Sequence, residues 1–228
     1  MKEMIITLNG NYNYGNRLQN YALVEYLNLN FNSNTKTLWD KNIYVNKFTQ
    51  FKNKIKYILK SKYRYDIIRK NNIKKFTDKY FDIHYDEPSS TLNINYKNFI
   101  VGSDQVWNPL FWSDVEKEYK TYFLRFADEQ KRIAYAASFG ISELPREYHE
   151  MFKEGLKEIP YISVREKAGA DIVKQLTGRD VPVLVDPTLL IEAEHWRTLE
   201  MQPVWYKGEK YILTYFLGNV PPMLDRLA

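Results

Sequence analysis

The chain of 228 residues is 44% hydrophobic and 27% charged, with a formal net charge of +5, a composition typical of a globular protein with a sizeable core. It has no cysteine and only three histidines, which excludes disulfides and thiolate chemistry and disfavours a zinc site of His and Cys ligands. The amino terminus soon turns polar, and no run of about 18 apolar residues occurs. We predict a cytoplasmic protein without a signal peptide.

The first predicted unit is a strand at 3–8, a loop at 9–16 and a helix that ends near residue 29. The loop places two glycines before a helix amino terminus, where free N–H groups and the helix dipole favour an anion. It matches neither a GxGxxG sequence nor a P-loop. Two interpretations stay open: Gly15 and Asn16 form an anion-binding turn, or Gly15 only permits a tight turn.

A second strand, 35–39, leads into a basic block at 41–82, which contains 13 Lys and Arg against 3 Asp. Its net charge of +10 leaves about −5 for the rest of the chain. Apolar residues recur there at spacings that suit two amphipathic helices. Such a block is usually a solvated face over a packed stripe; the functional alternative is docking to the inner membrane leaflet or a phosphorylated lipid carrier. We expect no nucleic-acid binding, because no recognised binding motif accompanies the charge.

The central stretch passes within a few residues from a buried strand, 96–101, to a dense set of polar groups. Four polar side chains follow the strand: Ser103, Asp104, Gln105 and Asn108. In open α/β sheets, ligands bind beyond the carboxyl ends of the strands, so these side chains would face one site. The plainer interpretation is a Ser-Asp helix cap followed by Trp107 in the core. The two neighbouring amides favour a binding site.

The chain then continues with two extended segments, a helix and a strand: 122–126, 132–140, 145–157 and 161–166. The second segment ends in small residues, Ser138 among them, which let a ligand or another backbone approach closely. Arg165 is predicted at the same sheet edge as Asp104. An arginine there can hold a carboxylate or phosphate bidentately, or it can form a salt bridge to Glu166.

We place the first domain at 1–200. Its last part contains a helix at 168–176, a strand at 181–185, a turn at Asp186 and another helix at 191–199. The polar stretch 201–210 is the predicted linker. Residues 211–218 are expected to form a strand that opens a second domain at 211–228, too short to be complete. The predicted fold is α/β, a Rossmann-like, mostly parallel sheet with helices on both faces.

Five stretches resemble, in order and approximate spacing, the polysaccharide pyruvyl transferase family: residues 13–23, 101–108, 134–140, 162–166 and 185–190. The resemblance covers residue 1 to about 218 and corresponds to the first half to two-thirds of a typical member. It implies a two-domain arrangement like that of the GT-B glycosyltransferases, with the active site between the domains and the second domain truncated here. Members carry a Ser-Phe-His-Gly-like motif in that domain, which none of the three histidines matches.

The resemblance also implies phosphoenolpyruvate as donor, a sugar of a cell-surface polysaccharide or its lipid-linked precursor as acceptor, and neither a metal nor a cofactor. Ketal formation requires protonation of the donor methylene carbon and removal of a proton from each attacking hydroxyl. We expect Asp104 to orient or deprotonate the acceptor hydroxyl and Arg165 to pair with the donor carboxylate or phosphate. The residues expected to bind the substrates are Gly15, Asn16, Gln19, Ser103, Gln105, Asn108 and Ser138.

Two other classes of function stay open on the sequence alone. One is a GT-B-like glycosyltransferase that uses a nucleotide sugar, and the other is a non-catalytic sugar-binding protein. The five motifs favour pyruvyl transfer. The expected partners are then phosphoenolpyruvate and a sugar acceptor; the anionic inner face of the membrane is a third partner only under the docking interpretation of the basic block.

Overall fold

A computed structural model describes residues 2–10, 13–39, 61–86, 88–204 and 206–212, with side chains of the third range from residue 67. The chain divides into two compact units, Met1–Glu192 and Ala193–Ala228. In the second unit the described residues include one short helix, α8 (Ala193–Arg197). The predicted strand at 211–218 is represented only by its first two residues, which are exposed and irregular; residues 213–218 lie outside the described chain. The domain boundaries, the truncation and the GT-B arrangement stay predictions.

The first unit is built on a six-stranded sheet in the order β3-β2-β1-β4-β5-β6. Its strands are β1 (Lys2–Ile6), β2 (Asn34–Trp39), β3 (Ile83–Tyr85), β4 (Asn98–Val101), β5 (Arg132–Ala137) and β6 (Tyr161–Val164). Every neighbouring pair is parallel, which confirms the predicted Rossmann-like α/β fold. The strand order reverses between β1 and β4, and ligands of such sheets bind at this switch point.

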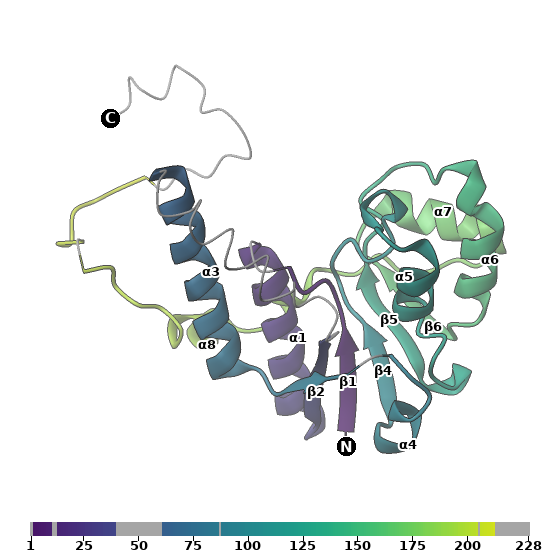
Figure 1. Cartoon of the computed structure of the whole chain (residues 1–228), viewed down its shortest axis with the longest axis horizontal. Helices are drawn as coiled ribbons and strands as arrows, with labels where there is room; N and C mark the ends of the chain where they lie inside the picture. Colours follow the sequence, from purple (N-terminus) through teal and green to yellow (C-terminus); the bar gives the residue numbers. More distant parts are fainter. Residues whose placement is uncertain (1, 11–12, 40–60, 87, 205, 213–228) are drawn as a thin grey trace, which may run out of the picture. The chain divides into compact units, whose positions relative to one another are not determined.

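Helices cover both faces of the sheet, as predicted (Figure 1). The helices of the first unit are α1 (Tyr14–Phe31), α3 (Ser61–Tyr80), α4 (Leu92–Asn95), α5 (Val115–Tyr122), α6 (His149–Lys157) and α7 (Lys167–Thr177). Short 3-10 turns are η2 (Pro109–Phe111), η3 (Glu129–Lys131), η4 (Arg146–Tyr148) and η5 (Pro187–Leu189). The first half of the basic block, 41–60, lies outside the described residues; its second half forms α3. Within the described chain, no helix has the length and apolarity needed to cross a membrane.

Each central strand contributes side chains to two hydrophobic layers, because successive residues of a strand point to opposite faces of the sheet. Met4 and Phe99 belong to the larger layer under α5, α6 and α7, whereas Ile5 and Ile100 pack with Leu23 of α1. The first helix is tied in turn to α3 by aromatic contacts, including Tyr21 with Phe76 at 5.6 Å between ring centroids. The sheet edge that carries the site is therefore supported from both faces.

Trp107 anchors the polar stretch after β4 to the larger hydrophobic layer. Its ring is fully buried and stacks on Phe123, with centroids 5.5 Å apart and planes 15° apart. Its Nε1 donates to the Tyr122 carbonyl at 3.1 Å. The extended segment predicted at 122–126 is wrong for this reason: Tyr122 ends α5, and the chain turns through Leu124 at φ 56° to close over Trp107.

Two further differences concern the sheet. The strand predicted at 181–185 is wrong. These residues run beside the edge strand β6 and form one isolated bridge with it, between Val183 and Val164. Strand β3 was not predicted, because three residues, two half-buried and one exposed, give almost no alternating pattern. The short helix α4 was missed for the same reason of length.

A β-bulge deforms β5 where it reaches the sheet edge. Ala136 has φ 47°, in the left-handed region, and the register with β6 shifts between Ala134 and Ala137. Ser163 of β6 compensates, because its Oγ accepts from the Ala136 N–H at 2.8 Å and donates to the Ala134 carbonyl at 3.1 Å. Bulges of this kind change the direction of the following chain, here the stretch that begins with Ser138.

Replacing Ser163 with Ala should lower the free energy of unfolding by about 1–3 kcal/mol, because the buried Ala136 N–H loses its hydrogen bond to Ser163 Oγ. Urea unfolding followed by circular dichroism measures the change. Ser142→Ala, at an exposed position, is the control and should alter stability little. Equal midpoints for the two variants would contradict the role given to Ser163.

Candidate functional site

The loop after β4 is folded by its own backbone before any side chain contributes. Gly102 N–H donates to the Ile6 carbonyl at 2.9 Å, and Ser138 N–H donates to the Asp104 carbonyl at 3.1 Å. Trp107 N–H returns a bond to the Ser138 carbonyl at 3.1 Å. These hydrogen bonds therefore attach the loop to the residues at the carboxyl ends of both neighbouring strands, β1 and β5.

No helix begins at Ser103 or Asp104, so the interpretation of this pair as a helix cap is wrong. Asp104 Oδ1 instead accepts from the next N–H along the chain, that of Gln105, at 2.8 Å. The cap is supplied later by Asn108, whose Oδ1 accepts from Leu110 N–H at 3.1 Å at the start of η2. Asn108 Nδ2 also donates to Gln105 Oε1 at 3.0 Å.

The structure brings Asp104 and Arg165 to the same sheet edge. Arg165 follows β6, and its Nη1 donates to the Ser103 carbonyl and, at 3.2 Å, to Asp186 Oδ2. Its Nε lies 3.3 Å from Glu166 Oε1, the salt bridge that was one of the two interpretations of Arg165. We call these five residues, 103, 104, 165, 166 and 186, the Arg165 cluster.

Burial raises the pKa of Asp104 above its ordinary value of 3.8, and the negative charge of Asp186 acts in the same direction. The Gln105 N–H and the Arg165 guanidinium oppose this shift. Within the described chain, Asp104 Oδ2 accepts no hydrogen bond. Asp104 is therefore a half-buried carboxylate with increased basicity and one open oxygen, which suits a proton acceptor.

Asp186 and Glu166 were not among the predicted site residues. Asp186 Oδ2 accepts from Ser103 Oγ at 3.0 Å, besides Arg165, and its Oδ1 caps η5 through Thr188 N–H at 3.0 Å. Glu166 Oε1 accepts from Ser138 Oγ. A signal for Asp186 was present, since an Asp before Pro at a strand exit was recognised, but only as a turn.

Several predicted substrate ligands are buried and bonded to the protein itself. Ser103 and Ser138 are fully buried, and Gln19 of α1 is 4% exposed. Gln19 Nε2 donates to Thr7 Oγ1 at 2.9 Å, while its Oε1 accepts from Ser103 Oγ at 3.4 Å. These contacts connect α1 to the loop after β4. The substrate-binding roles predicted for these residues stay predictions.

The small residues at the end of the segment 132–140 leave room for the side chain of Gln105. Gly140 has φ +63°, and a Cβ added there would come within 2.2 Å of Gln105 Oε1. Only glycine tolerates both the backbone conformation and this approach. Gln105 itself is half-buried beside Asp104, so it stays a candidate for a sugar hydroxyl.

At the amino end of α1, Asn13 Oδ1 accepts from Gly15 N–H at 2.8 Å, so the helix cap already uses one of the free donors. Asn16 is buried and donates through Nδ2 to the Leu8 carbonyl at 3.3 Å. The sequence reasoning missed Arg17, whose guanidinium is buried over the Trp39 ring at 4.5 Å. Both the anion-binding turn and the simple tight turn remain compatible with this arrangement.

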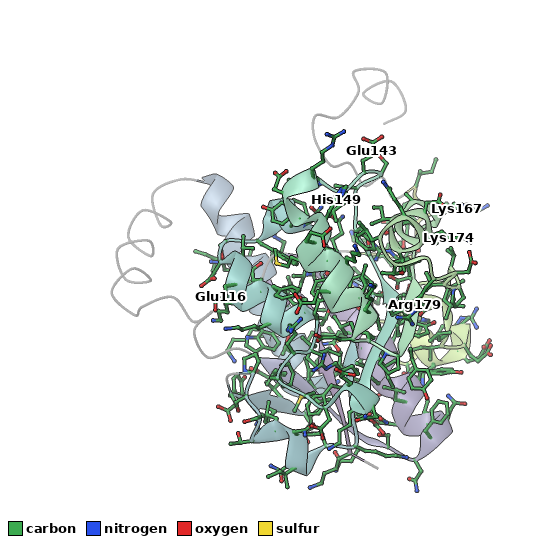
Figure 2. The ribbon with its side chains drawn as sticks, turned by 90° about the vertical axis from the view of Figure 1, so that its right-hand side faces the viewer. Glu116, Glu143, His149, Lys167, Lys174 and Arg179 are labelled. Atoms are coloured by element: carbon green, nitrogen blue, oxygen red, sulfur yellow. The ribbon has the colours of Figure 1, made fainter. Side chains whose placement is uncertain are left out.

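No group of three or more His, Cys, Asp or Glu in the described chain is arranged to hold a metal ion. His149 lies in the helical layer, at the first residue of α6 (Figure 2), where its Nε2 hydrogen bonds to the Leu144 carbonyl at 2.9 Å. His84 of β3 contacts the Tyr96 ring. The hydrogen bonds of both histidines are thus made to Tyr96 and Leu144, outside the Arg165 cluster.

Fold and site together define a Rossmann-type α/β protein with a carboxylate-rich cluster around one arginine, at the sheet edge where such folds bind polar ligands. Residues 13–217, most of the chain, match the family described as "Polysaccharide pyruvyl transferase". The chain belongs to the polysaccharide pyruvyl transferase family. Comparisons with curated proteins and with solved structures each gave no match.

The raised pKa of Asp104 predicts a pH-dependent stability difference for Asp104→Asn. The folded state binds the Asp104 proton more tightly than the unfolded state does. Protonation of Asp104 therefore contributes its full stabilisation below about pH 3.8, and this stabilisation is lost as the pH rises through the folded-state pKa. The variant cannot ionise and should be more stable than the parent at pH 7, with the gap narrowing toward pH 4.

Urea midpoints measured in steps from pH 4 to pH 8 check this expectation. Asp114→Asn is the matched control, because it removes a carboxylate from an exposed helix cap where Asn caps equally well. A stability difference for Asp104→Asn that does not change with pH would contradict the inferred environment of Asp104.

Proposed function

We propose that the protein takes part in transferring pyruvate from phosphoenolpyruvate to a sugar as a ketal, on a cell-surface polysaccharide or its lipid-linked precursor. Membership of the family supports the reaction class. The observation that carries the assignment of residues is Asp104, a half-buried carboxylate with a raised pKa and an open oxygen beside Arg165.

The reaction fixes what the site must supply. A proton adds to the methylene carbon of the donor, and one sugar hydroxyl attacks the adjacent carbon. The bond from that carbon to the phosphate oxygen breaks, and a second hydroxyl forms the other ketal bond. Phosphate leaves, and each hydroxyl gives up its proton to a base. Asp104 takes the role of that base or orients the attacking hydroxyl.

The charges of the Arg165 cluster favour the acceptor sugar as the ligand nearest to Asp104. The cluster combines three carboxylates, Asp104, Glu166 and Asp186, with the single cation of Arg165. A neutral ligand that donates hydroxyl hydrogens suits such a surface. Phosphoenolpyruvate carries both a carboxylate and a phosphate, so Arg165 is its natural partner within the cluster.

The substitution Asp104→Asn should reduce pyruvate transfer by about 10²- to 10⁴-fold, the range for removing a general base, while the fold is kept because the side chain keeps its shape. Transfer of label from ¹⁴C-phosphoenolpyruvate to polysaccharide or lipid-linked acceptors measures it. Asp114→Asn again serves as control and should retain the parental rate.

Turnover of Asp104→Asn at near the parental rate would exclude Asp104 as the base. Label incorporated from a nucleotide sugar and not from phosphoenolpyruvate would instead identify a glycosyltransferase. Saturable sugar binding without turnover of either donor would identify a non-catalytic sugar-binding protein.

We also propose that α3 meets an anionic surface on the cytoplasmic side of the membrane, through a lipid-linked acceptor or the bilayer that holds it. Helix α3 buries Ile73 and Thr77 and exposes Lys74, Lys75 and Lys79, of which Lys74 is ion-paired with the exposed Asp78. Lysines on one exposed helix face attract anionic lipid by about 1 kcal/mol each near the surface.

Vesicles with anionic lipid should therefore retain the protein at low salt and release it as the Debye length falls from ~30 Å at 0.01 M to ~8 Å at 0.15 M. Charge reversal at Lys74, Lys75 and Lys79 should abolish retention. The matched control reverses three exposed lysines of α5 and α7: Lys120, Lys167 and Lys174. Equal retention on neutral and anionic vesicles would leave α3 as an ordinary solvated face.

A further inference from the structure

We propose that Asp186 is a positioning residue that holds the guanidinium of Arg165 in place and leaves a single nitrogen, Nη2, directed at the donor. The inference rests on the proposed pyruvate transfer for its kinetic consequence. The arrangement itself follows from contacts that do not depend on the reaction.

Asp186 uses both carboxylate oxygens, and the two have separate tasks. Oδ1 accepts from Thr188 N–H at 3.0 Å and Thr188 Oγ1 at 2.8 Å, which fixes the carboxylate to the start of η5. Oδ2 accepts from Ser103 Oγ at 3.0 Å and Arg165 Nη1 at 3.2 Å. One side chain thus joins η5, the loop after β4 and the exit of β6.

The backbone before Asp186 is itself held against the sheet. Val164 N–H donates to the Pro182 carbonyl at 3.0 Å, and Leu184 N–H donates to the Val164 carbonyl at 2.9 Å. The Tyr135 hydroxyl donates to the Val185 carbonyl at 3.2 Å. Pro187 then starts η5 with a restricted φ. The carboxylate of Asp186 is therefore placed by rigid neighbours rather than by Arg165.

The remaining contacts of Arg165 determine what it can offer a ligand. Nη1 is shared between Asp186 Oδ2 and the Ser103 carbonyl, and Nε faces Glu166 Oε1 at 3.3 Å. Among the described residues, Nη2 has no partner, and the side chain is 28% exposed. Arg165 therefore presents one nitrogen to a ligand and not the two-pronged contact expected from the sequence.

Two isosteric substitutions separate positioning from charge. In Asp186→Asn, one carboxylate oxygen becomes an NH₂ group. If Oδ1 keeps its bonds to Thr188, the NH₂ group faces Arg165 Nη1, donor against donor, and Arg165 loses its anchor. In Glu166→Gln, Oε1 can still accept from Arg165 Nε while one negative charge disappears. Both variants remove the same charge, but only the first releases the guanidinium.

The expected results for the donor KM therefore have opposite signs. Asp186→Asn should raise it about tenfold to hundredfold, the loss of a charge-assisted contact. Glu166→Gln should lower it, because repulsion of the anionic donor decreases. In an Arg165→Lys background, Asp186→Asn should add little, since it acts through the guanidinium. A lowered KM in both single variants, or full additivity in the double variant, would overturn the proposal.

A readout without turnover separates this inference from the proposed function. The Arg165 charge lowers the pKa of Asp104 more than Asp186 raises it. If Asp186→Asn releases Arg165, the pKa of Asp104 rises; if Arg165 stays in place, that pKa falls because only a negative charge is lost. Carboxyl ¹³C NMR titration, assigned with Asp104→Asn, gives the sign. A fall refutes positioning by Asp186, whereas absent phosphoenolpyruvate turnover with a rise refutes only the proposed function.

Discussion

The ion pair between Arg165 and Asp186 connects the parts of the molecule on which the site depends. Arg165 leaves β6, Asp186 precedes η5, and Ser103, which follows β4, contacts both through its carbonyl and its hydroxyl. A partly buried charge pair contributes little net stability, because desolvation offsets most of the attraction. Its value here is geometric: it fixes the relative positions of three chain segments that are far apart in sequence.

The position of the Arg165–Asp186 ion pair is well defined because the packed layers beneath it are rigid. Trp107 stacks on Phe123 and anchors the loop after β4 to the larger hydrophobic core. The bulge at Ala136, bonded to Ser163, redirects β5 so that the Ser138 amide and carbonyl meet that loop. The unfavourable φ of Ala136 costs about 1–2 kcal/mol, and such strain persists where the surroundings overdetermine the backbone.

Sequence reasoning recovered the parallel sheet, because buried strands with polar residues at their ends leave a clear pattern in β1, β4 and β6. It also predicted that Asp104 and Arg165 share one edge. The prediction failed where tertiary contacts override the local pattern. The aromatic run 122–126 was predicted to be extended, but Tyr122 ends a helix and its carbonyl accepts the Trp107 Nε1 hydrogen bond. It missed Asp186 as a site residue, because its partner Ser103 is 83 positions away, and no local spacing reveals such a contact.

In the proposed reaction, the charge balance of the Arg165 cluster also limits how the donor can bind. A doubly charged ligand that approached Asp104 directly would meet two further carboxylates, so attraction by one guanidinium nitrogen has to compete with repulsion at similar distance. A neutral acceptor meets no such penalty and can donate hydroxyl hydrogens to Asp104. In the proposed reaction, phosphoenolpyruvate would therefore approach Arg165 through Nη2 rather than approach Asp104. On this proposal the cluster acts chiefly on the hydroxyl side of the reaction, and Arg165 lies between the acceptor and the donor.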